Sequence, residues 1–229
     1  MKVISIPDIH GRSFWKDIKI NEFDLIIFLG DYVDSDTIPR EIIIQNLLEI
    51  IELKKQNPSK VVLLIGNHDA QYRYFPHYGC SEIDMKIQEQ LTQIFKDNKE
   101  LFCFAFQIGR HVWTHAGISN SWFKRCSEAV TEFSVSEPLD EIADIINQMA
   151  KSRHIGKVFS ISLIRGGYEQ FGGVVWADKT ETETEHLTGI HQYTGHNKVK
   201  EITKFGDNYS SIHYLDCLNT KEEYRILEI

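Results

Sequence analysis

LIIFLGDYVD, residues 25–34, is a short apolar run that stops at a glycine and two carboxylates. A run of this length bounded by a breaker predicts a buried strand of a parallel sheet. Sites in open α/β sheets lie at the carboxyl ends of such strands. We therefore expect Asp31 to lie at the functional edge of the sheet.

The same pattern occurs twice more in the first third of the chain. The strand-like residues 3–6 lead into Asp8 and His10, and residues 61–65 lead into GNHD, residues 66–69. Because parallel strands end at the same edge of a sheet, these polar groups are expected to gather there.

Length and charge limit the possible architectures and partners. The 229 residues are expected to form a single domain, residues 1–229. Lysine and arginine total 25 against 33 aspartates and glutamates, a formal charge of -8. This balance offers no general attraction to anionic lipid or to extended nucleic acid, so we expect neither as a partner.

The cysteines and the apolar segments indicate a compartment. The four cysteines are far apart, with no Cys-x-x-Cys, which favours neither a zinc ribbon nor a disulfide framework and fits a reducing cytoplasm. No apolar stretch approaches the roughly 18 residues of a spanning helix. A cytoplasmic protein without a membrane segment is expected.

Periodicity and breakers predict the other elements. Helices are expected over residues 40–53, 82–97, from Ser119 or Asn120 to about 130, and over 137–150. Strands are expected over residues 101–106 paired with 111–114, over 190–194, and over 209–217 paired with 222–228 as a closing hairpin. Residues 71–80 are interpreted as an irregular aromatic segment, either a lid or packed on the sheet edge, and residues 178–186 as a solvated acidic loop.

Six side chains at predicted strand ends form a mixed oxygen and imidazole set: Asp8, His10, Asp31, Asn67, His115 and His196. Such a set suits manganese, iron or zinc better than calcium, and manganese is the metal that we expect. Two ions are the natural count for six ligands. One would be held by Asp8, His10 and Asp31, and the other by Asp31, Asn67, His115 and His196.

Asp31 would then bridge two ions ~4 Å apart, as in hydrolytic two-metal sites, with a bridging hydroxide directed at phosphorus. The other histidines are interpreted as surface or hydrogen-bonded structural residues. They are His77, His111, His154, His186, His191 and His213.

The ordered motifs resemble those of the calcineurin-like metallophosphoesterase superfamily, above all its serine/threonine phosphoprotein phosphatases and their phage and bacterial relatives. The matching stretches, which span nearly the whole chain, are DIHG at 8–11, GDYVD at 30–34, GNHD at 66–69, HAG at 115–117 and GH at 195–196. The resemblance implies an α/β fold, an αββα sandwich of two mixed β-sheets flanked by helices.

The resemblance also implies three catalytic residues, His68, Asp69 and Asp34. His68 would be the general acid that protonates the leaving alkoxide, oriented by a carboxylate. Asp69 follows it, where the phosphoprotein phosphatases usually have glutamate. Asp34 would not bind the metal itself but would hold a metal ligand or a metal-bound water in place.

One departure concerns phosphate binding. In the family GDYVD continues into Arg-Gly, whose arginine grips phosphate, but this chain has Ser35-Asp36. Arg165, beside two glycines, is the first candidate to replace that arginine, followed by Arg12 and Arg73.

Three function classes remain open. The first is a metal-dependent phosphatase that hydrolyses phosphomonoesters on a phosphoprotein, a nucleotide or another small molecule. The second is a phosphodiesterase, nuclease or dinucleoside tetraphosphate hydrolase on the same scaffold. The third is a non-catalytic binding module, which is disfavoured because none of the ligands is missing. Lys198 stands where diesterases commonly carry the second histidine of Gly-His-x-His, which favours the monoesterase.

Overall fold

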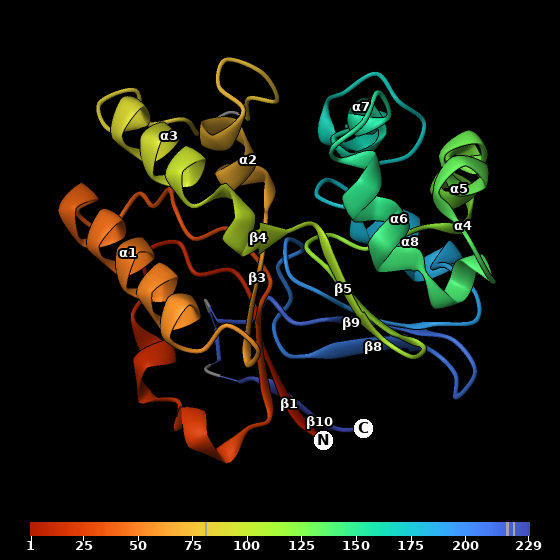
Figure 1. Ribbon diagram of the computed structural model, residues 1–229, viewed down its shortest axis with the longest axis horizontal. Coiled ribbons are helices and arrows are strands. Elements are labelled where there is room, and N and C mark those ends of the chain that lie inside the picture. Colours follow the sequence, from red (N-terminus) through yellow and green to blue (C-terminus); the bar gives the residue numbers. More distant parts are fainter. Residues whose placement is uncertain (81, 219, 222) are drawn as a thin grey trace. The chain divides into compact units, whose positions relative to one another are not determined.

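The computed structural model describes residues 1–80, 82–218, 220–221 and 223–229. The chain divides into two compact units, each built on its own five-stranded sheet (Figure 1). Unit 1 comprises Met1–Cys103 with Tyr224–Ile229, and unit 2 comprises Phe104–Glu223. The expected α/β fold with two mixed sheets and helices is confirmed, while the expectation of a single domain stays a prediction.

The sheet of unit 1 has the strand order β10-β1-β2-β3-β4. Its strands are β1 (Lys2–Ile6), β2 (Leu25–Phe28), β3 (Val61–Leu64), β4 (Phe102–Cys103) and β10 (Arg225–Glu228). β1 to β4 run parallel, and β10 is antiparallel to β1. Every residue of β2 and β3 is buried, as continuous apolar runs predict for central parallel strands.

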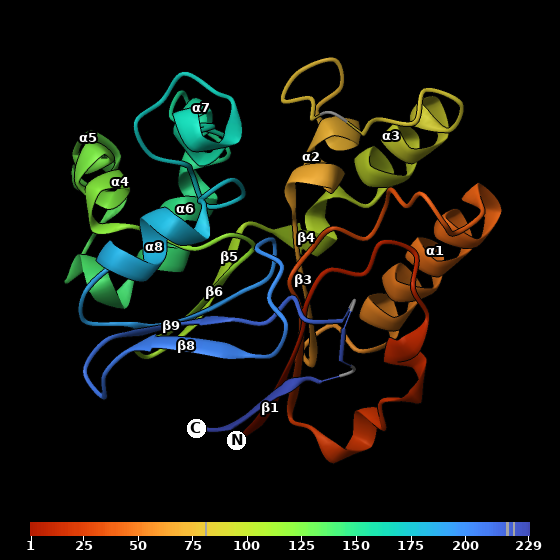
Figure 2. The same cartoon turned by 180° about the vertical axis from the view of Figure 1, so that it is seen from behind.

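The helices of unit 1 are α1 (Arg40–Gln56), α2 (Asn67–Arg73) and α3 (Gln88–Asp97), with short 3₁₀ turns at Phe14–Asp17, Ile20–Glu22 and Lys99–Leu101. All three helices gather on one side of the sheet (Figures 1 and 2). α1 starts after Pro39, as predicted, and ends at Gln56, three residues later than predicted. α3 begins six residues later than predicted.

The sheet of unit 2 has the order β5-β6-β7-β9-β8. Its strands are β5 (Ala105–Ile108), β6 (His111–Thr114), β7 (His191–Thr194), β8 (Thr203–Gly206) and β9 (Ser211–Tyr214). β6, β7 and β9 run parallel, and the two outer strands are antiparallel to their neighbours.

The helices of unit 2 lie together on one side of its strands (Figure 2). They are α4 (Asn120–Arg125), α5 (Ser127–Phe133), α6 (Ile142–Met149), α7 (Ile155–Val158) and α8 (Lys179–Glu185), with 3₁₀ turns at Pro138–Asp140 and Leu163–Arg165. Ser119 caps α4, as expected, by accepting a hydrogen bond from the Trp122 amide at 3.0 Å.

Three predictions about elements are wrong. The stretch 101–106 is not one strand: β4 pairs with β3 in unit 1, and the predicted pairing with residues 111–114 holds only for Ala105 and Phe106, which belong to β5. The closing hairpin does not form among the described residues: β9 pairs with β7 and β8, whereas β10 pairs with β1. Residue 222, part of that expected hairpin, lies outside the described residues.

The third error concerns residues 178–186, interpreted as a solvated loop, which form helix α8. Asp178 caps this helix, its carboxylate accepting from the Thr180 amide at 2.9 Å. Glu181 is buried and accepts a hydrogen bond from the Gly172 amide at 2.8 Å. Within the described part of the chain, every helix is too short or too polar to span a lipid bilayer.

Candidate metal centre

Asp8, His10 and Asp31 come together in unit 1, as the sequence predicts. Each offers one ligand atom, and these atoms all lie within 4.8 Å of one another. The loops after β1 and β2 meet because the strands are parallel neighbours with Ile6 opposite Phe28. The backbone oxygen of Asp31 accepts from the amides of Ile9 and His10, at 3.0 and 2.8 Å.

The ring of His10 is oriented for metal binding. Its Nδ1 lies 2.9 Å from the backbone oxygen of Val33 and 2.8 Å from that of Asp34. Carbonyl oxygens only accept, so Nδ1 carries the proton and Nε2 presents its lone pair. Nε2 lies 4.0 Å from an Asp8 carboxylate oxygen and 3.9 Å from an Asp31 one. Such anchoring of the second ring nitrogen is usual for metal-binding histidines, so these residues fit a metal.

Backbone strain is concentrated at the candidate site. Among the described residues, five that are not glycine have a positive φ between 45° and 61°: His10, Asp31, Asp34, Tyr78 and His196. Side chains disfavour this conformation, which persists where the surroundings enforce it and is common at functional sites. Four of the five are candidate site residues.

Two glycines allow the loops after β2 and β3 to touch. Gly30 has φ +101°, and a Cβ there would lie 2.4 Å from the Gly66 nitrogen. A Cβ on Gly66 would lie 2.1 Å from Oδ1 of Asp31. The Asp31 carboxylate therefore occupies space that only glycine at position 66 leaves open.

Asn67 and His68 open helix α2 directly after β3. Asn67 is buried, and the His68 amide donates to Oδ1 of Asp31 at 2.9 Å. Nδ1 of His68 lies 2.8 Å from Oδ2 of Asp34. The carboxylate that orients His68 is thus Asp34, not the neighbouring Asp69.

Asp69 has a different task. It is fully buried, and its carboxylate accepts hydrogen bonds from the amides of Asp31 (2.7 Å), Tyr32 (2.9 Å) and Gly66 (2.9 Å). Asp69 therefore fixes the backbone around Asp31 from behind.

Gln71 and Tyr72 belong to the site and were not anticipated. The Gln71 amide donates to Oδ2 of Asp34 at 2.6 Å, and the Tyr72 hydroxyl donates a short hydrogen bond to Oδ1. Both lie three or four positions after His68, on the same face of α2. Helical spacing would have revealed them, but residues 71–80 were interpreted as irregular.

The electrostatics of His68 follow from these contacts. Burial lowers the pKa of the ring, but the charge of Asp31 and the hydrogen bonds with Asp34 and Cys80 outweigh it and raise the pKa to about 12. These contacts therefore favour the protonated form of the ring.

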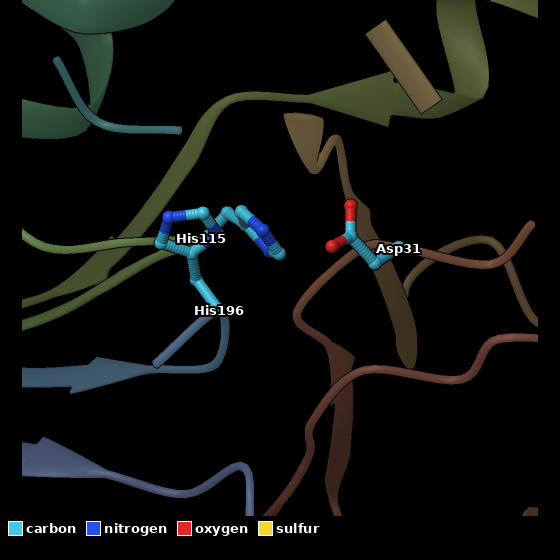
Figure 3. A group of neighbouring side chains, drawn as sticks. All are labelled: Asp31, His115 and His196. Carbon is cyan, nitrogen blue, oxygen red and sulfur yellow. The ribbon is translucent and has the colours of Figure 1, made fainter. Parts of the chain in front are cut away.

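His115 and His196 come together in unit 2. They follow the parallel neighbours β6 and β7, and the Gly195 amide donates to the His115 backbone oxygen at 2.8 Å. Their rings lie side by side, with centroids 5.0 Å apart and planes at 60° (Figure 3). Asp31, also drawn in Figure 3, belongs to unit 1. Two adjacent imidazoles fit a transition metal.

The three candidate arginines differ in their contacts. Arg165 forms an ion pair with Asp178 at 2.7 Å and donates to the side-chain oxygen of Asn197, the residue after His196. Arg12 donates to the backbone oxygens of Asp8 (2.7 Å) and Ile9 (3.1 Å). Arg73 lies over the ring of Tyr74 at 5.4 Å.

Several other histidines make structural hydrogen bonds, as expected. In unit 2, Nδ1 of His111 lies 2.9 Å from the Tyr193 hydroxyl, and that of His191 lies 2.8 Å from Oγ of Ser211. Nε2 of His154 lies 3.1 Å from Glu132.

Comparison with protein families gives a match that covers most of the chain. The family described as calcineurin-like phosphoesterase matches residues 1–203. A sequence comparison with curated proteins gives no match.

Solved structures share the fold at low sequence identity. A mutant cold-active protein tyrosine phosphatase superposes with a TM-score of 0.61 at 15% identity, covering 99% of this chain and 75% of the other. The cold-active protein tyrosine phosphatase of a psychrophilic Shewanella species gives 0.54 at 14%, with 99% and 75% covered. A serine/threonine phosphatase from Saccharomyces cerevisiae gives 0.53 at 14%, with 93% and 67% covered.

Proposed function

Because the chain belongs to the calcineurin-like phosphoesterase family, whose members are metal-dependent hydrolases of phosphoric esters, we propose that it is a phosphatase that hydrolyses phosphomonoesters. The substrate would be a phosphoprotein or a small phosphoester such as a nucleotide. The structural neighbours that are themselves phosphatases of proteins agree with this direction.

We propose two bound transition-metal ions, with manganese as the expected metal. Asp8, His10 and Asp31 would hold one ion, and Asp31, Asn67, His115 and His196 the other. The ions would neutralise charge on the phosphoryl oxygens and lower the pKa of the attacking water. The anchored Nδ1 of His10 and the paired imidazoles of His115 and His196 support this ligand set.

His68 would supply the proton that the leaving alkoxide needs. Its Nδ1 faces Asp34 at 2.8 Å, and its Nε2, which lies 3.9 Å from the carboxylate of the exposed Glu82, would be the donor to substrate. Asp34 is in turn held by Gln71 and Tyr72, so the imidazole is positioned before substrate binds.

Arg165 is our candidate for gripping the phosphate. Its guanidinium donates to Asn197, adjacent to the proposed ligand His196, and 29% of its side chain is exposed. Like Arg165, Arg12 donates to groups of the protein, in its case to backbone oxygens of its own loop. Arg73 lies at the far end of α2.

One observation carries the preference for monoesters over diesters: Lys198, an exposed lysine, occupies the position of a second histidine after Gly195-His196. The first ion would then keep three protein ligands. A dianionic monoester can lie across both ions, whereas a diester has one charge fewer and depends more on contacts to its flanking groups. The net charge of -8 also gives no sign of a basic groove for a nucleic acid backbone.

The test compares kcat/KM on four substrates under one manganese condition. They are p-nitrophenyl phosphate, bis-p-nitrophenyl phosphate, a phosphopeptide and a diadenosine polyphosphate. We expect a monoester to be preferred. A diester or dinucleotide preferred by about tenfold, or 1.4 kcal/mol, would replace this proposal with a phosphodiesterase.

A further inference from the structure

Cys80 lies against the pair formed by His68 and Asp34, and the proposed hydrolysis gives this thiol no task. Its Sγ lies 3.8 Å from Nδ1 of His68, which itself lies 2.8 Å from Oδ2 of Asp34. One ligand atom from each of the three residues lies within 4.8 Å of the other two. The thiol is half-buried.

These separations are close to those of a zinc site. Tetrahedral zinc with Zn–S near 2.3 Å and Zn–N or Zn–O near 2.0 Å places sulfur and nitrogen roughly 3.6 Å apart, and nitrogen and oxygen roughly 3.3 Å apart. The observed separations of 3.8 and 2.8 Å differ from these by roughly 0.2 and 0.5 Å. Small side-chain rotations would admit the ion.

The buried side-chain amide of Gln71 holds Cys80 and Asp34 in place. The side chain of Gln71 is fully buried, its Oε1 accepts from the Cys80 amide at 3.1 Å, and its Nε2 donates to Oδ2 of Asp34 at 2.6 Å. One side chain thus fixes both the residue bearing the thiol and the carboxylate. Cys80 is therefore held beside His68.

We propose that Asp34, His68 and Cys80 form a zinc site, distinct from the ligand set of the two catalytic ions, through which zinc inhibits the enzyme. Binding would release the thiol proton and the Nδ1 proton of His68 to solvent. Zinc would bond to Sγ, to Nδ1 and to a carboxylate oxygen of Asp34.

The inhibition rests on the proposed function of His68. Zinc on Nδ1 would occupy the side of the ring that otherwise faces Oδ2 of Asp34 at 2.8 Å. The ion would also replace the contact between His68 and Asp34 that orients the ring.

The thiol separates this site from the catalytic ligands. A thiolate is a soft ligand that binds zinc far more tightly than manganese, and the proposed dinuclear ligand set contains no cysteine. Zinc binding that depends on Cys80 therefore identifies this site and not the dinuclear one.

The first experiment measures binding without activity. The reduced protein is titrated with Co²⁺, and the thiolate-to-cobalt charge-transfer band is followed in the near ultraviolet. We expect the band in the wild type and in Cys103→Ser, a control at a second half-buried cysteine, but not in Cys80→Ser. Zinc should abolish the band. No band, or the same band in Cys80→Ser, would overturn the proposal.

The second experiment measures inhibition. Manganese-loaded enzyme is assayed with increasing zinc in the presence of a phosphine reductant. Because Cys80→Ser loses one of three protein ligands, we expect half-inhibition at about tenfold or more higher zinc than in the wild type and Cys103→Ser. Equal inhibition of all three proteins would overturn the inhibitory role.

The two experiments separate this inference from the proposed function. A charge-transfer band that depends on Cys80, in a protein that hydrolyses no phosphoester, would leave the zinc site standing and the proposed function refuted. Matching thermal unfolding of both variants and the wild type shows that the substitutions leave the fold intact.

Discussion

Asp31 is the residue on which both proposed ion sites depend. Asp31→Asn keeps an oxygen that can accept from the His68 amide but removes the charge shared by the ions. We expect metal content after manganese reconstitution to fall from about two ions per chain toward zero, because a bridging carboxylate organises both sites. Elemental analysis of the desalted protein measures this.

The matched control is Asp8→Asn, which touches only the first proposed ion and should leave about one ion bound. An Asp31→Asn protein that still holds both ions would show that another residue bridges them.

His68 should matter for proton transfer and not for metal binding. His68→Asn is expected to lower turnover by ~10²-fold or more with metal content unchanged, the size expected for one general acid. Turnover and bound manganese are measured on the same preparation.

The leaving group distinguishes a general acid from a positioning residue. p-Nitrophenyl phosphate has a good leaving group that needs little protonation, so His68→Asn should impair its hydrolysis less than that of an alkyl phosphate. Equal losses on the two substrates would mean that His68 only positions other groups.

For single residues, the order of motifs along the chain predicts which side chains come together but not which hydrogen-bond partners they have. Asp8, His10 and Asp31 could be predicted because parallel strands end at one edge. The partner of His68 could not, because Asp34 reaches it through a left-handed turn in a loop. Asp69, which follows His68 in the sequence, instead accepts a hydrogen bond from the backbone amide of Asp31.

At the scale of elements, the contact between the loops after β2 and β3 should tolerate no side chain at position 66. Gly66→Ala places a Cβ 2.1 Å from Oδ1 of Asp31 and 2.6 Å from its nitrogen. We expect loss of manganese binding together with a lower melting temperature, measured by elemental analysis and by circular dichroism.

Gly156→Ala in α7 is the control, because a Cβ there meets no described heavy atom within 4 Å. A Gly66→Ala protein that binds manganese like the wild type would mean that Asp31 need not keep its position.

Local patterns predicted the strands but not the choice of strand partner. β9 and β10 are both short strands near the chain end, and a hairpin is the simplest pairing for them. β10 instead adds an antiparallel edge strand to the sheet of unit 1, with four of its residues paired with β1. The charged sequence of helix α8 favours a solvent-exposed loop. In the structure, however, Glu181 is buried and accepts a hydrogen bond from the Gly172 amide.

At the scale of the whole molecule, removal of metal should stop hydrolysis without unfolding the chain. Each unit has its own sheet, and the ligands of unit 1 are tied to protein groups such as the Asp69 carboxylate and the carbonyls around His10. EDTA treatment is therefore expected to abolish activity and leave the far-ultraviolet circular dichroism spectrum intact.

Manganese added back in excess of the chelator should restore the activity. A loss of helical signal on chelation would show instead that the ions contribute to folding, as in structural metal sites.

The pairing of β10 with β1 has a mechanical consequence. Lys2 lies opposite Glu228, and the amino group of Met1 donates to the backbone oxygen of Ile229 at 2.6 Å, so both chain ends leave the sheet side by side. Tension applied between them would pull at right angles to the two strands and load their hydrogen bonds one pair at a time. The hydrogen bonds between β1 and β10 would therefore break one after another at low force. Residues 104–223 would bear no tension until this strand pair had separated.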